Sequence, residues 1–91
     1  SSDTYFKSQM ALYQQGAIDE KSAHLIALAA SAATKCQYCI PYHQAELRRL
    51  GATEDEIKTA ILLAGDVMRM STLFYGNEYD LEAFKAMLRG E

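Results

Sequence analysis

The sequence predicts an all-α fold, a small domain of about five helices. Good helix formers such as Ala, Leu, Glu and Lys dominate the 91 residues, and the chain holds one Pro and five Gly. No segment alternates apolar and polar residues cleanly enough to indicate a β-strand. The chain shows no linker, low-complexity tract or internal repeat, so we expect a single domain over residues 1–91.

The first two helices are predicted from their apolar stripes and their ends. The first runs from about Asp3 to Gln15 and ends at Gly16, because glycine tolerates the backbone conformation that commonly follows a helix. One stripe of this helix carries Phe6, Met10 and Tyr13. Asp19 is the predicted N-cap of the second helix, which reaches about Thr34. Its apolar residues recur at helical spacing, at Leu25, Leu28, Ala29 and Ala32.

The third helix contains His43 to Leu50 and stops at Gly51. Its start is restricted by Pro41, because proline is tolerated in the first turn of a helix but not deeper. We therefore expect this helix to begin between about Gln37 and Ile40. Near its end, Arg48-Arg49 is interpreted as a solvated pair of charges that the helix dipole favours.

The last two helices are predicted from their N-terminal caps. Thr53 followed by Glu56 is a capping box, in which each end satisfies an otherwise unpaired backbone donor. It opens a long fourth helix that continues through about Leu73. Asp80 caps a short terminal helix that reaches about Leu88.

The net charge and the hydropathy of the chain argue against nucleic-acid and membrane partners. The 9 basic and 12 acidic side chains give a net charge of −3, whereas nucleic-acid binding needs a basic face. No apolar run approaches the roughly 18–20 residues that span a bilayer. No basic segment followed by an apolar core indicates an export signal. We therefore expect a cytoplasmic protein with no nucleic-acid and no membrane partner.

The apolar stripes of the second and fourth helices are wider than one small bundle needs. A chain of this length buries only roughly 60–65% of the surface that it exposes when unfolded. Apolar surface in excess of a domain's own core is usually covered by another subunit. We therefore expect a homo-oligomer.

Reactive side chains are concentrated in one motif, C-x-x-C-x-x-x-H, formed by Cys36, Cys39 and His43. At about 100° per residue, these three side chains project within about 60° of one another if the segment is helical. With the helix start restricted by Pro41, Cys39 is expected in the first turn and Cys36 just before it. The motif therefore predicts two thiols and an imidazole gathered at a helix N-terminus.

Two thiols in this position are suited to redox chemistry. The pKa of a C-x-x-C thiol at a helix start falls from about 8.5 to between roughly 3.5 and 7.5, because the helix dipole stabilises the thiolate. Cys36 and Cys39 are close enough to form a reversible disulfide, and His43 can accept a thiol proton or return one to a leaving group. Tyr38 and Tyr42 flank the thiols, either as pocket walls or as packing. The motif predicts a thiol oxidoreductase without an organic cofactor or a metal, since the dithiol carries the electrons itself.

His24 is the fourth candidate catalytic residue. It interrupts the apolar second helix, and Glu20 lies one turn before it, where a carboxylate orients an imidazole and favours its protonated form. Two other interpretations remain open. Cys36, Cys39, His43 and His24 also form a legitimate set of zinc ligands, although the second C-x-x-C or separated His pair of common zinc fingers is absent. Alternatively, the thiols are inert and the chain is a non-catalytic interaction protein.

Three segments, Gly16–Lys21, Leu25–Ala29 and Cys36–His43, resemble the core of the AhpD-like alkylhydroperoxidases. These belong to the carboxymuconolactone decarboxylase family. The segment Leu50–Ile57 is similar to the family's entry into its long helix, so the matching stretches run from about Gly16 to Leu73. The cysteine motif is typical of the redox branch of the family.

The resemblance implies an all-helical fold that assembles as trimers or hexamers. It also implies a site that reduces a small hydroperoxide or a disulfide and is recharged by a lipoyl or thioredoxin-like dithiol. By position, Cys36 and Cys39 are the redox pair, with Cys39 the family's usual sulfenic acid, and His43 is the relay histidine. The family places its relay glutamate twelve residues before the first cysteine, where this chain has His24. The substitution implies either that His24 takes over the relay or that the peroxidase activity is altered.

Overall fold

The computed structural model describes residues 2–91, apart from the side chains of Ser2, Asp3 and Phe6. This part of the chain folds into five helices and no strand, which confirms the predicted all-α fold. In chain order the helices are α1 (Ser2–Gln15), α2 (Glu20–Thr34), α3 (Cys39–Arg49), α4 (Glu54–Gly76) and α5 (Leu81–Leu88). The predicted place of Phe6 on the stripe of the first helix lies outside the described side chains.

The helix starts follow the predicted caps. Asp19 accepts a hydrogen bond from the amide of Ser22 at 3.0 Å. Thr53 and Glu56 exchange hydrogen bonds of 3.0 and 2.8 Å in a capping box. Asp80 caps α5 through its carboxylate in the same way as Asp19 caps α2. Local side-chain chemistry therefore fixes where three of the helices begin.

The C-terminal ends of α3 and α4 are set in different ways. The third helix stops because Gly51 adopts a left-handed conformation at φ 81°, which glycine reaches without steric cost. The fourth helix continues to Gly76, beyond its predicted end near Leu73. Nothing in the sequence interrupts α4 before Asn77, whose side chain then donates a hydrogen bond to the Leu73 carbonyl at 2.8 Å.

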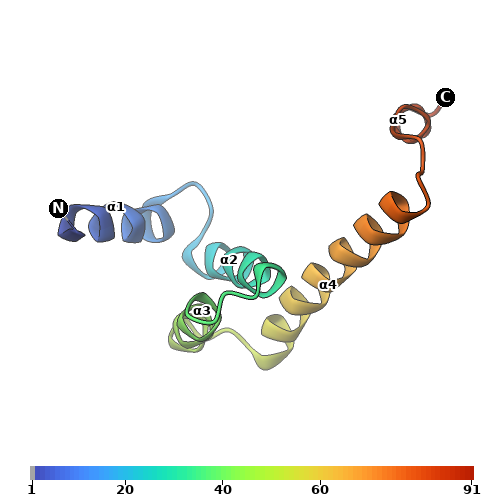
Figure 1. Ribbon diagram of the computed structural model, residues 1–91. Coiled ribbons are helices and arrows are strands. Elements are labelled where there is room, and N and C mark those ends of the chain that lie inside the picture. The colour runs from blue at the N-terminus through green and yellow to red at the C-terminus, as the bar shows by residue number, and fades with distance from the viewer. Residues whose placement is uncertain (1) are drawn as a thin grey trace.

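The core lies where α3 and α4 pack against α2 near the middle of the molecule (Figure 1), and α1 also packs against α2. Its buried apolar side chains are Leu28, Leu47, Ile57 and Ala60. The second helix contacts α1, α3 and α4. The loop after it carries Cys36, and Cys39 and His43 follow in α3.

The second half of α4 and all of α5 extend away from this core (Figure 1). The ring of Phe74 stacks on Tyr79 with 5.2 Å between the ring centroids and lies 5.5 Å from Phe84, which holds α5 against the end of α4. Within residues 2–91, no helix combines the length and the apolar character needed to cross a membrane.

Candidate active site at the start of the third helix

Cys36 and Cys39 are joined by a disulfide, with 5.3 Å between their Cα atoms. Cys36 lies in the loop after α2, and Cys39 is the first residue of α3, as the motif predicts. The amide of Cys39 points at the sulfur of Cys36, at an N–Sγ distance of 3.2 Å. Both cysteines are partly exposed, so a reagent in solution can reach the bond. The pair therefore forms a partly exposed disulfide at the start of a helix.

The backbone before the motif explains this placement. Lys35 ends α2 in the left-handed region at φ 56°, and the amide of Cys36 bonds back to the carbonyl of Ser31 at 3.0 Å. The amide of Ile40 then bonds to the Cys36 carbonyl at 3.1 Å, which starts the first turn of α3. Pro41 falls within that first turn, where a missing backbone donor costs nothing.

His43 lies one turn after Cys39 and contacts His24 of α2. The two Nδ1 atoms are 2.9 Å apart, and both side chains are buried. A neutral imidazole carries one proton, so one ring donates in this contact and the other accepts. When His43 donates, its Nε2 is a bare base, and when His43 accepts, its Nε2 carries the proton. The contact therefore couples the proton positions of the two histidines.

Burial sets the charge state of this histidine pair. Burial is the main cause that lowers the pKa of His24 and of His43 below the ordinary value of 6.5. The charge of His24 lowers the pKa of His43 further, because two cations cannot share so close a contact. The charge of Glu46 raises the pKa of both rings, and the charge of Glu20 raises the pKa of His24. The pair is therefore held mainly neutral, the form in which an imidazole works as a base.

Aromatic rings from two other positions enclose the pair. Tyr13 of α1 stacks on His24 with 4.4 Å between the ring centroids and an interplanar angle of 15°. Tyr42 meets His43 edge-on at 5.0 Å. Burial raises the pKa of Tyr42, which keeps its hydroxyl protonated. Tyr13 belongs to the predicted stripe of the first helix, but its stacking on His24 is not visible in the spacing.

A pocket of about 510 Å³ opens beside these groups. Cys39 and His43 both line it, so these two residues border the same space. Its remaining walls are Gln9, Met10, Tyr13, Tyr38, Tyr42 and Glu46. This is a concave, largely aromatic site with a few polar groups, as small-molecule sites commonly are.

The structure thus gathers the four predicted residues into two contacting pairs, Cys36 with Cys39 and His24 with His43. The zinc alternative needs both sulfurs free, whereas here they are bonded to each other. Among the described side chains, no group of three or more His, Cys, Asp or Glu residues is placed to hold a metal ion.

Two residues outside the predicted site also approach the histidine pair. Glu46 lines the pocket. Arg49, interpreted from the sequence as part of a solvated helix end, instead bridges Glu46 and Glu20. The i, i+3 spacing of Glu46 from His43 was the signal available in the sequence, but it is common on any helix.

Fold and site together define a class of small all-α proteins with a C-x-x-C disulfide at a helix start and a buried histidine beside it. Within that class, residues 2–74 match the model of the carboxymuconolactone decarboxylase family, and the chain belongs to this family. The resemblance inferred from the motifs is thereby confirmed.

Two relatives illustrate the match. The chain is 30% identical over 76 residues to a Paracoccus denitrificans protein described as uncharacterized protein 4 in the cox locus, covering 84% of this chain and 68% of that one. It is 34% identical over 61 residues to the alkyl hydroperoxide reductase AhpD of Maricaulis maris, covering 67% of this chain. The match spans only 35% of the length of AhpD. No solved structure matches the chain significantly.

Proposed function

We propose that the chain is a thiol-dependent oxidoreductase of the alkylhydroperoxidase type, which reduces a small hydroperoxide or a disulfide. The observation that carries the proposal is the Cys36–Cys39 disulfide at the N-terminus of α3, with Cys39 and His43 lining one pocket. Membership of the family and the similarity to AhpD support the same chemistry.

In the proposed cycle, the Cys39 thiolate attacks the terminal oxygen of the hydroperoxide. The O–O bond breaks, Cys39 becomes a sulfenic acid, and the alkoxide takes a proton and leaves as an alcohol. The Cys36 thiol then attacks the sulfur of Cys39, which forms the disulfide and releases water. The two thiols thus supply the two electrons. Cys39 is proposed as the attacking residue because it lines the pocket.

The histidine pair is proposed to move the protons of this cycle. A bare Nε2 of His43 accepts the thiol proton, and the same nitrogen returns it to the departing alkoxide. His24 adjusts by shifting the proton shared between the two Nδ1 atoms. In this proposal His24 takes over the task of the glutamate that the family places at its position.

An external dithiol, carried by a lipoyl group or a thioredoxin-like protein, is proposed to reopen the disulfide. Its thiolate attacks one sulfur, the second thiol resolves the mixed disulfide, and the donor leaves oxidised. The partial exposure of both cysteines and the high exposure of Tyr38 beside them support access by such a partner.

The proposal is tested by steady-state consumption of alkyl hydroperoxides and of a small aromatic disulfide, with dihydrolipoamide as the reductant. We expect turnover by the wild type that exceeds the reaction of dihydrolipoamide alone. The Cys36→Ser/Cys39→Ser double variant is expected to add nothing to that background. Full turnover by the double variant would exclude the proposed chemistry.

We also propose that the chain works as a homo-oligomer, with a second copy of the chain covering its apolar surface. The isolated chain exposes 7000 Å², about 1,700 Å² more than the roughly 5,300 Å² expected for a compact monomer of this mass. Its radius of gyration is 16.7 Å, against about 12 Å for a compact domain of this length. This excess is more than the roughly 800 Å² that one partner buries in a standard interface. It supports contacts with more than one neighbour, as in the trimers or hexamers that the resemblance implies.

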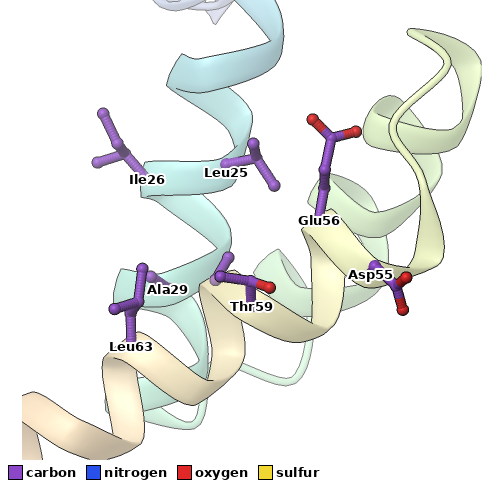
Figure 2. Close-up of a pocket in the computed structure, with 8 residues that line it drawn as sticks. Leu25, Ile26, Ala29, Asp55, Glu56, Thr59 and Leu63 are labelled. Atoms are coloured by element: carbon purple, nitrogen blue, oxygen red, sulfur yellow. The ribbon is translucent and has the colours of Figure 1, made fainter.

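The surface proposed for this contact is a groove of about 410 Å³ between α2 and α4 (Figure 2). Leu25, Ile26 and Ala29 come from α2, and Leu63 projects from α4, with Asp55 and Glu56 near the start of that helix. Leu63→Glu is expected to lower the mass measured by sedimentation equilibrium, because it places a charge in an apolar contact. Lys58→Gln, on the same helix but outside the groove, changes the net charge equally and should leave the mass unaltered. Unchanged assembly in Leu63→Glu would contradict this contact.

A further inference from the structure

Arg49 forms ion pairs with two carboxylates, one on α2 and one on α3, the helices that carry the buried histidines. Its Nη2 lies 2.6 Å from Glu46 of α3 and 3.5 Å from Glu20 of α2. Glu20 precedes His24 by one turn, and Glu46 follows His43 by three residues. The two acids therefore flank the histidine pair on both helices, with one guanidinium between them.

The setting of this bridge differs from that of an ordinary surface ion pair. The Glu20 and Glu46 side chains are only 25% and 27% exposed, and Glu46 lines the pocket with His43, whereas the Arg49 side chain is 55% exposed. Charges in partly buried positions are screened less than those in open solvent. The neighbouring Arg48 is as exposed as Arg49, but its partner Glu54 is 63% exposed, so the two ion pairs differ in the burial of their carboxylates.

We propose that Arg49, through its bridge to Glu20 and Glu46, is a positioning residue that sets how readily the His24–His43 pair takes up a proton. The inference rests on the proposed function, in which this pair moves the protons of the thiol chemistry. Arg49 touches neither sulfur nor imidazole in this role. It acts by balancing and orienting the two acids.

The charges around the pair determine in which direction a change at Arg49 moves the pKa of His24. Glu46 and Glu20 raise the pKa of His24, and Arg49 lowers it, against a background of burial that lowers it most. Among the described side chains, the rings of Tyr13 from α1 and Tyr42 from α3 also face the pair.

The fourth helix, which packs against α2, begins with three acids, Glu54, Asp55 and Glu56. Its Glu56 pairs with Lys21 of α2 at 2.8 Å, so these two charges offset each other. Loss of Arg49 therefore leaves two uncompensated acids, and loss of Glu46 leaves one acid paired with Arg49.

The test is an NMR titration of the imidazoles in the oxidised chain, whose sequence contains two histidines. Arg49→Met is expected to raise the titration midpoint of His24, because it removes a charge that lowers the pKa of this ring. Glu46→Gln is expected to lower it, and Arg49→Lys should restore the wild-type midpoint. General damage to the fold would move the first two variants in the same direction, so opposite movements identify the charge effect.

Arg48→Met is the matched control, since it removes the same charge from the adjacent residue. We expect its histidine midpoints to equal those of the wild type. Equal midpoints in Arg49→Met and Arg48→Met would overturn the proposal. The titration needs no turnover, so this result is separate from any failure of the proposed oxidoreductase activity.

Discussion

Replacing Cys39 with Ser is expected to lower hydroperoxide turnover by about a thousandfold or more, the scale typical for loss of a catalytic nucleophile. The reason is chemical, because a serine hydroxyl neither ionises near neutral pH nor forms a disulfide. The measurement is steady-state peroxide consumption with dihydrolipoamide. The substitution is nearly isosteric, so circular dichroism should show an unchanged helix content.

Cys36→Ser is the matched variant, because it keeps the attacking thiol and removes only the resolving one. With no reductant in solution, it is expected to consume about one equivalent of hydroperoxide per chain and then stop, with the sulfenic acid trapped on Cys39. A burst in Cys39→Ser and none in Cys36→Ser would reverse the two assigned roles. Full turnover in both single variants would contradict the dithiol mechanism itself.

Replacing His43 with Ala is expected to reduce kcat/KM by about 10²–10⁴-fold, the usual contribution of a general acid–base group. Because burial lowers the pKa of His43 below 6.5, the neutral base persists in moderately acidic solution. The wild-type pH profile should therefore lose activity only as the pH falls below 6.5. In His43→Ala this acid limb should disappear, since its titrating group is gone.

Substitutions of His24 test whether this residue relays protons or only packs against its neighbours. His24→Ala is expected to lower kcat/KM by about tenfold or more, because His43 loses its Nδ1 partner and Tyr13 loses its stacked ring. His24→Glu supplies the residue that the resembled family carries at this position, and it should recover most of that loss. An unchanged kcat/KM in His24→Ala would contradict the proposal that His24 replaces the relay glutamate. It would not contradict the dithiol mechanism.

Most of the fold could be predicted because its boundaries depend on local chemistry. The caps at Asp19, Thr53 and Asp80 and the stop at Gly51 each need only residues within one turn. The same holds for the disulfide, since Cys36 and Cys39 are three positions apart and the start of α3 follows from Pro41. The fourth helix runs past its predicted end near Leu73 because Phe74 and Tyr75 do not break a helix, and it ends at Gly76.

The rest of the site depends on how the helices pack, and no spacing in the sequence specifies this. The contact between His24 and His43 forms only because α2 and α3 pack with these two faces together. Tyr13 reaches the pair from α1, thirty residues before His43 in the chain. The bridge made by Arg49 likewise needs acids from both helices, so a helix-end arginine was interpreted only as a solvated charge.

The most direct test of the central claim follows the bond between the two sulfurs through one catalytic cycle. The wild-type protein is reduced with dihydrolipoamide, freed of reductant, and mixed with one equivalent of an alkyl hydroperoxide. Alkylation and peptide mass mapping then count the free thiols. We predict two free thiols before the peroxide, a Cys36–Cys39 disulfide and one alcohol per chain after it, and recovery of both thiols when dihydrolipoamide returns. Thiols that stay free while the peroxide persists would contradict the account.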